Sequence, residues 1–238
     1  MEAARGLVRS KFFSAPFYLH FYVTERCNLR CKMCNIWKRK SPEMTLGEIE
    51  QCVRVLKKLK VQNIVLTGGE PLLRPDISDI VKLFNDHGFT TRLQTNGTLV
   101  TREKIRALAE AGLKNITISL DTLDEKKFDW ICESKDLVQK VDESLDLFAE
   151  YIKGFIVVNT AVSRLNIPEL PEIVRYVNSK GAYASLVPVH LHSSGMTTSF
   201  CYGYDEEMIV SKDLLPETEK VYAKLIKMKK EGYRIINY

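Results

Sequence analysis

Residues 18–24, which read YLHFYVT, decide the fold that the sequence predicts. Successive side chains of a β-strand point to opposite faces of its sheet. Here one face carries Tyr18, His20, Tyr22 and Thr24, and the other carries Leu19, Phe21 and Val23. A parallel sheet covered by helices on both faces would show near-continuous apolar strands instead. A polar inner face is typical of a barrel whose interior is a ligand cavity, and we expect such a barrel.

Outward from this strand, short β-branched and aromatic runs alternate with longer amphipathic runs, which predicts a strand-helix repeat. We expect strands at residues 18–24, 61–67, 89–95, 115–121, 154–162 and 182–189. We expect helices at residues 45–60, 76–87, 101–111, 136–152, 168–180 and 213–231. Thr45 and Glu48 form a capping box at the start of the first helix, and the final YRIINY predicts the start of a further strand.

Six such units are fewer than the eight of a closed barrel. The predicted fold class is therefore α/β: a partial, about six-stranded parallel β/α barrel, TIM-barrel-like and open on one side. We expect one core domain over residues 17–238. Residues 1–16 form an N-terminal segment that we expect to be a docking helix. Its basic, amphipathic character also allows weak contact with a membrane surface.

The composition excludes several classes of protein. The 238 residues are 45% hydrophobic, which excludes a disordered or collagen-like chain. The chain has 35 Lys and Arg against 30 Asp and Glu, which gives a net charge of +5. Spread over 238 residues, this positive charge is too small to indicate a nucleic-acid-binding module. No apolar run approaches the roughly 18 residues of a membrane span, and the first residues lack a secretory signal. We therefore expect a cytoplasmic protein.

Three of the six cysteines, Cys27, Cys31 and Cys34, stand close together after the first strand. In a reducing cytosol, closely spaced cysteines are more often metal ligands than disulfide partners. Three thiolates on one short loop can hold three irons of a cubane cluster and leave the fourth iron open. The alternatives are reduced cysteines without metal and a zinc-stabilised binding module that takes its fourth ligand from elsewhere. Cys52 and Cys132 are expected in the core.

From Tyr18 onward the sequence resembles the radical S-adenosylmethionine (radical SAM) superfamily. The resemblance rests on the C-x-x-x-C-x-x-C loop and on four strand ends: LTGGEPLLR (66–74), QTNG (94–97), SLD (119–121) and NT (159–160). It implies that Cys27, Cys31 and Cys34 bind a 4Fe-4S cluster, and that Glu70 pairs with the amino group of S-adenosylmethionine (SAM). Each strand end taken alone is also typical of a turn or helix cap. The implied SAM-binding residues are Met33, Gly68, Gly69, Glu70, Thr95, Asn96, Ser119, Asp121 and Asn159.

The same resemblance implies a reaction. A one-electron reductant such as flavodoxin or ferredoxin supplies an electron, and SAM is cleaved to methionine and a 5'-deoxyadenosyl radical. That radical abstracts hydrogen from a small-molecule, lipid or peptide substrate, or adds to it. The chain is thus expected to be a radical SAM oxidoreductase or transferase. No side chain is assigned a catalytic role beyond the cluster ligands.

Within the superfamily, the pattern VTERCNLRC, LTGGEPLLRPD and ITISLDTLD is most similar to the molybdenum cofactor biosynthesis enzyme that rearranges GTP. His20, Val65 and Val157 stand where that enzyme places GTP-contacting basic groups, so we do not expect GTP as the substrate. The C-terminal cysteine triad for a second cluster is also missing. Residues 159–182 resemble peptide- and cofactor-modifying relatives, which continue into a cysteine-rich extension. We expect either a truncated chain or a naturally short protein.

The substrate candidates lie on or near the expected cavity. His20, Tyr22 and Gln94 come from the first and third strands, and His190 and His192 follow the sixth strand on a shared face. The two histidines are equally typical of hydrogen-bonded surface residues. The loop after them is long enough to be a functional lid. Within it, Cys201 is either a hydrogen-atom donor to a product radical or an inert thiol.

Overall fold

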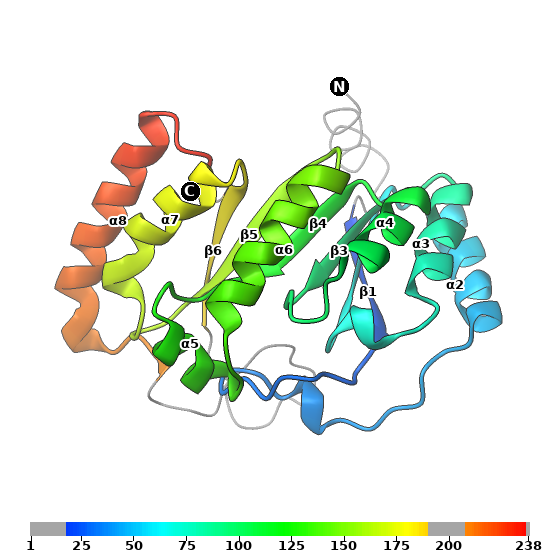
Figure 1. Ribbon diagram of the computed structural model, residues 1–238, viewed down its shortest axis with the longest axis horizontal. Helices are drawn as coiled ribbons and strands as arrows, with labels where there is room; N and C mark the ends of the chain where they lie inside the picture. Colours follow the sequence, from blue (N-terminus) through cyan, green and yellow to red (C-terminus); the bar gives the residue numbers. More distant parts are fainter. Residues whose placement is uncertain (1–17, 190–207, 237–238) are drawn as a thin grey trace.

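The computed structural model describes residues 18–189 and 208–236. Its centre is a six-stranded parallel sheet whose spatial order, β1-β2-β3-β4-β5-β6, follows the sequence (Figure 1). Among the described residues no hydrogen bonds join β1 to β6, so the sheet is not closed. The predicted partial barrel, open on one side, is confirmed. The strands are β1 (Tyr18–Thr24), β2 (Asn63–Gly68), β3 (Thr90–Thr95), β4 (Asn115–Ser119), β5 (Ile156–Val162) and β6 (Tyr183–Pro188).

All six predicted helices are present, and one was missed. The Thr45 capping box is also confirmed. The missed helix, α5, directly follows the SLD strand end; Asp124 caps its first turn, accepting from Lys127 N at 3.0 Å. The helices are α2 (Leu46–Lys58), α3 (Ile77–Asp86), α4 (Arg102–Glu110), α5 (Glu125–Cys132), α6 (Leu137–Tyr151), α7 (Leu170–Ser179) and α8 (Leu215–Lys230). Short 3-10 helices cover Ile36–Lys38, Pro71–Leu73, Ile167–Glu169 and Lys212–Leu214.

The core lies between the outer face of the sheet and the helices that cover it (Figure 1). Alternate strand residues such as Leu66, Leu93 and Ile118 are buried there against the helices. The intervening residues face the concave side, where Val65 is 1% and Val157 3% exposed although neither belongs to the helix-facing core. The alternation that predicts a barrel is therefore real, although part of the inner face is apolar.

Parallel strands bring all their carboxyl ends to one edge of the sheet. In Figure 1 the cysteine loop (blue) and α5 (green) lie together at that edge. After the last helix, Ile235 forms an isolated parallel bridge with Ala184 of β6. This single bridge lies in the YRIINY segment where a further strand was expected, but the described residues there form no strand. Residues 1–16 lie outside the described part of the chain, so the N-terminal docking helix stays a prediction. In the part of the chain that is described, no helix has the length and apolar character to cross a membrane.

Candidate functional site

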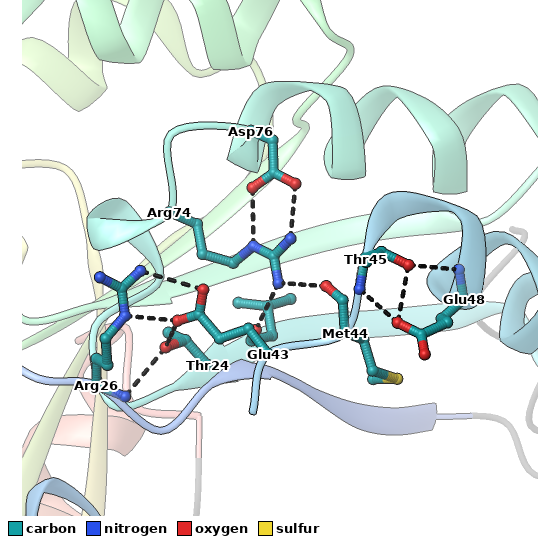
Figure 2. Close-up of polar contacts among 9 residues, drawn as sticks. Thr24, Arg26, Glu43, Met44, Thr45, Glu48, Arg74 and Asp76 are labelled. Atoms are coloured by element: carbon teal, nitrogen blue, oxygen red, sulfur yellow. Dashed lines mark hydrogen bonds and ion pairs between the residues drawn. The ribbon is translucent and has the colours of Figure 1, made fainter. Parts of the chain in front are cut away.

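One polar network fastens both ends of the cysteine loop (Figure 2). At the start of the loop, Thr24 and Arg26 donate to the carboxylate of Glu43, which lies at its end. The two Arg26 bonds measure 2.7 and 3.1 Å. Although partial burial acts to raise it, these bonds hold the pKa of Glu43 below its usual value. The segment between residues 24 and 43 is therefore a closed loop with a fixed base.

Arg74 is the buried centre of this network, with a side chain that is 5% exposed. Its guanidinium donates to the backbone oxygens of Val23 at 3.1 Å and Met44 at 2.9 Å, and pairs with Asp76 through bonds of 2.8 and 2.6 Å. It thereby joins β1, the end of the cysteine loop and the segment after β2. The capping box of Thr45 follows at once, so α2 begins where the loop ends (Figure 2).

Gly68 and Gly69 let the end of β2 pack directly against the start of the loop. A Cβ atom at Gly68 would lie 2.0 Å from the backbone oxygen of Thr24, and one at Gly69 would lie 2.1 Å from that of Arg26. The close approach allows two backbone hydrogen bonds, from Gly69 N to Thr24 O at 2.9 Å and from Glu70 N to Arg26 O at 2.8 Å. Contact between protein backbones therefore requires glycine here, apart from any ligand.

The Glu70 carboxylate is fully buried and accepts three hydrogen bonds. Oε1 accepts from Leu72 N at 3.0 Å and from Thr95 Oγ1 at 2.8 Å, and Oε2 accepts from Asn96 N at 2.7 Å. Burial raises its pKa against the lowering effect of these bonds. Glu70 thus ties the end of β3 to the end of β2. The sequence suggested only a pairing with SAM for Glu70, and did not suggest this structural role.

Asn96 connects the end of β3 to the cysteine loop. Its Nδ2 donates to Asn28 Oδ1 at 3.0 Å and, at 3.9 Å, to the Sγ atom of Cys27. Its Oδ1 accepts from Thr98 N at 3.0 Å and Thr98 Oγ1 at 2.7 Å, while Asn28 Nδ2 donates to the same hydroxyl at 2.7 Å. A predicted SAM contact and a predicted cluster ligand are therefore neighbours in the structure.

Cys27, Cys31 and Cys34 are all partly exposed. Burial raises the pKa of Cys27 to about 12, and Cys31, Glu70 and Cys34 nearby act in the same direction. Within the described ranges, no three His, Cys, Asp or Glu side chains are placed to hold one metal ion. A cubane, by contrast, takes each thiolate on a different iron. Met33, between Cys31 and Cys34 in sequence, is buried in the core.

The C-terminal end of α5 supports the loop from a second direction. The backbone N–H groups of Arg30 and Lys32 donate to Cys132 O at 3.3 Å and Ile131 O at 2.9 Å. Cys132 is 3% exposed, as its predicted place in the core requires. The nearby side chain of Cys31 and burial raise the pKa of Cys132. Cys52 is only partly buried.

Ser119, Asp121 and Asn159 meet at the ends of β4 and β5. Ser119 and Asn159 are paired in the register of the two strands. The Asp121 carboxyl is buried and accepts from Ala161 N at 2.8 Å. Burial raises its pKa to about 7, against the lowering effect of that bond. A buried carboxyl with such a pKa at a strand end is typical of a functional site.

His20, Tyr22 and Gln94 lie on the concave face, as the alternation predicts. His20 shares a cross-strand row with Val65 and Arg92. Burial and, secondly, Arg92 lower the pKa of His20. The other substrate candidates, His190, His192 and Cys201, lie outside the described residues and stay predictions.

Both tryptophans of the chain contact cations of the cysteine loop. Lys32 Nζ lies 4.3 Å from the ring centroid of Trp130, which is on α5. Arg30 and Lys38 lie 5.7 and 5.1 Å from the ring centroid of Trp37. Cations this close to an aromatic face are attracted to it. The loop thus presents a basic and aromatic surface beside its cysteines.

Sequence reasoning missed three residues of this site. Arg92 had a readable signal, because it alternates with Gln94 and therefore shares its face. Arg74 stands in the LTGGEPLLR motif, but its backbone partners come from β1 and the cysteine loop and leave no trace in local sequence. Cys132 was predicted only as a core residue. It lies near Cys31 because the end of α5 packs against the cysteine loop.

Comparisons with known proteins agree with this geometry. Residues 21–177 match the family described as the radical SAM superfamily. A GTP 3',8-cyclase of Chlorobaculum tepidum is 32% identical over 231 residues, covering 92% of this chain and 68% of that protein. A GTP 3',8-cyclase of Campylobacter fetus is 34% identical over 172 residues, covering 69% and 53%.

Among solved structures, Streptococcus suis SuiB bound to S-adenosylmethionine has a TM-score of 0.73 at 17% identity, covering 98% of this chain and 53% of SuiB. This likeness shows the shared fold. The chain spans about half the length of SuiB and of the Campylobacter fetus relative. The match to the family covers most of the sheet, and the chain belongs to the radical SAM superfamily.

Proposed function

We propose that the chain uses a 4Fe-4S cluster and SAM to generate a 5'-deoxyadenosyl radical that abstracts hydrogen from a substrate or adds to it. The contact between Asn96 and Cys27 carries the proposal, because it joins a strand end of the predicted SAM site to a predicted cluster ligand. When bound, the cluster and SAM supply one-electron cleavage of the sulfonium bond. The chain then acts as an oxidoreductase or transferase.

The residues fit these groups. Cys27, Cys31 and Cys34 would hold the cluster on a loop that is fastened at its base and supported by β2, β3 and α5. Three ligands from one anchored loop suit a cubane with one open iron. These fixed surroundings would hold the cluster beside the strand ends that form the proposed SAM site.

The SAM site would be formed by Met33 and by residues of four strand ends. Asp121 is a buried carboxyl whose pKa is about 7. Its carboxylate could accept hydrogen bonds from SAM. Glu70, with its three protein donors, would act mainly by holding the ends of β2 and β3 in register. The other proposed contacts are Gly68, Gly69, Thr95, Asn96, Ser119 and Asn159.

The substrate would lie on the concave face, near His20, Tyr22 and Gln94. GTP is the compound named for the GTP 3',8-cyclase relatives. Here two concave positions expected to be basic in those enzymes are Val65 and Val157, both buried. We therefore propose a different small-molecule, lipid or peptide substrate. Incubation with GTP, SAM and reductant should give no cyclised product.

An electron must reach the cluster from outside. The basic and aromatic surface formed by Arg30, Lys32, Lys38, Trp37 and Trp130 adjoins the proposed ligands and suits an acidic carrier. A flavodoxin or ferredoxin has the required one-electron chemistry. Such reductants and reduced thiols are both found in the cytoplasm, where we place the reaction.

Anaerobic reconstitution with iron and sulfide, followed by reduction in the presence of SAM, tests the proposal. We expect about four irons per chain by the chemistry of the cubane, and 5'-deoxyadenosine detected by chromatography. A Cys27/Cys31/Cys34 triple alanine variant should give neither, while Cys52→Ala, which removes a thiol outside the loop, should give both. One tightly bound zinc and no 5'-deoxyadenosine would support the zinc-stabilised module instead.

A further inference from the structure

A fourth thiol, Cys132, lies against the loop that carries the proposed cluster ligands. The last two carbonyl groups of α5, those of Ile131 and Cys132, accept hydrogen bonds from Lys32 N and Arg30 N at 2.9 and 3.3 Å. These two bonds involve the residues on either side of Cys31. They hold the backbone of Cys31 beside the end of α5, where its side chain is near enough to raise the pKa of the Cys132 thiol.

The two thiols differ in access to solvent. Cys31 is partly exposed, whereas Cys132 is 3% exposed within the core. A small oxidant from solvent therefore reaches Cys31 first, because oxidation of cysteine depends on exposure. Cys132 is shielded from the oxidant but lies at the end of α5, beside the backbone of Cys31. This is the arrangement of a reactive cysteine with a resolving partner.

We propose that, when the loop holds no metal, Cys31 and Cys132 form a disulfide in response to a two-electron oxidant such as hydrogen peroxide. In the first step the Cys31 thiol is oxidised to a sulfenic acid, and peroxide is reduced to water. In the second step the Cys132 sulfur attacks the Cys31 sulfur, the S–S bond forms, and the hydroxyl leaves as a second water with the thiol proton. Two thiols and one peroxide give one disulfide and two waters.

The disulfide has two consequences for the loop. It prevents further oxidation of Cys31 to the irreversible sulfinic and sulfonic acids. It also removes one of the three proposed ligands, so an oxidised chain cannot load a cluster until a dithiol reductant restores both thiols. This second consequence rests on the proposed function, whereas formation of the disulfide does not.

Peptide mapping of the metal-free chain after treatment with hydrogen peroxide tests the proposal. We expect the major cross-linked peptide to join Cys31 to Cys132, and dithiothreitol to reverse it. In Cys132→Ser the cross-link should be absent, and Cys31 should accumulate as sulfinic acid. In Cys31→Ser the buried Cys132 should remain a thiol. Cys52→Ser, which removes a partly exposed thiol on α2, should cross-link like the wild type.

Cross-links that join Cys31 to Cys27 or to Cys34 as the main product would overturn the proposal, as would full conversion of Cys31 to sulfinic acid in the wild type. Mapping the wild type decides this even if a variant fails to fold. Iron loading of chains never exposed to oxidant is measured in parallel. A chain that forms the Cys31–Cys132 disulfide but never binds iron would contradict the proposed function alone.

Discussion

The side-chain amide of Asn96 lies between two partners on the cysteine loop, 3.0 Å from Asn28 Oδ1 and 3.9 Å from Cys27 Sγ. Asn96 directly follows β3, which ends at Thr95, so this contact ties a strand end of the sheet to the first cysteine of the loop. Glu70 fixes the backbone of the same residue through Asn96 N. The position of Cys27 therefore depends on residues at the ends of β1, β2 and β3 as well as on the sequence of the loop.

Asn96→Ala should loosen this tie. It removes one hydrogen bond to Asn28 and two from Thr98, each worth about 0.5–1.5 kcal/mol net. We therefore expect a loss of about 1.5–4.5 kcal/mol in the free energy of unfolding, measured with urea. Iron retention during gel filtration should also fall. Asn96→Asp keeps the oxygen that accepts from Thr98 and should lose less stability. Full iron retention in Asn96→Ala would show that the amide does not position the loop.

Gly69→Ala should be strongly destabilising, because its Cβ atom would lie 2.1 Å from the backbone oxygen of Arg26. Overpacking of this kind costs about 1–3 kcal/mol or more. Gly47→Ala is the matched control, because Gly47 is an exposed residue of helix α2 and a Cβ atom there meets nothing within 4 Å. This variant should stabilise the chain by up to about 1 kcal/mol. Equal unfolding free energies for the two variants would contradict the close packing of β2 on the loop.

Arg74→Lys should destabilise the base of the loop. A lysine cannot reproduce the forked bonds to Asp76 together with those to Val23 O and Met44 O. We expect a loss of about 2–4 kcal/mol in the free energy of unfolding, in line with other broken buried pairs.

The exposed pair formed by Arg54 and Glu50 in α2 supplies the control. Arg54→Lys should change the free energy of unfolding by less than about 0.5 kcal/mol. If Arg74→Lys is as stable as Arg54→Lys, the buried guanidinium is not the centre of the network.

Asp121 should make the stability of the ligand-free chain depend on pH. Its pKa is raised from 3.8 to about 7, so between these values the folded chain keeps a proton that the unfolded chain has released. Stability from this group is complete below about pH 4 and is lost as the pH rises through 7, by on the order of 4 kcal/mol. Unfolding free energies measured from pH 4 to 8 should show this fall.

Asp121→Asn is the test of that assignment. It keeps an oxygen that can accept from Ala161 N, and it cannot ionise. The variant should become more stable than the wild type as the pH rises from 5 to 8. Parallel pH profiles for the two proteins would mean that Asp121 titrates as an ordinary exposed carboxyl.

The sequence predicted the fold well because the signals for it are local. Alternation in residues 18–24 indicated the inner face, and helix caps such as Thr45 marked where the helices begin. The missed helix α5 lies between two elements that were predicted, and its eight residues are too few to show a clear amphipathic period.

The site was harder to predict, for a physical reason. Short motifs named the loop cysteines and the residues at the strand ends. The contacts that hold them, however, join segments far apart in sequence, such as Arg74 to Val23 and Cys132 to Cys31. Local sequence does not encode which buried carboxylate, amide or thiol fills the space between two elements. Two of the three donors around Glu70, Thr95 Oγ1 and Asn96 N, appear only when β2 and β3 are placed side by side.

The most direct test of the central claim is electron paramagnetic resonance of the reconstituted, reduced chain with and without SAM. If the three cysteines of the loop leave one iron open toward the strand ends, the reduced cluster should give a signal that changes shape when SAM is added. The change should be lost in a variant without the loop cysteines. A cluster signal that SAM leaves unchanged would contradict the claim that loop and strand ends form one site.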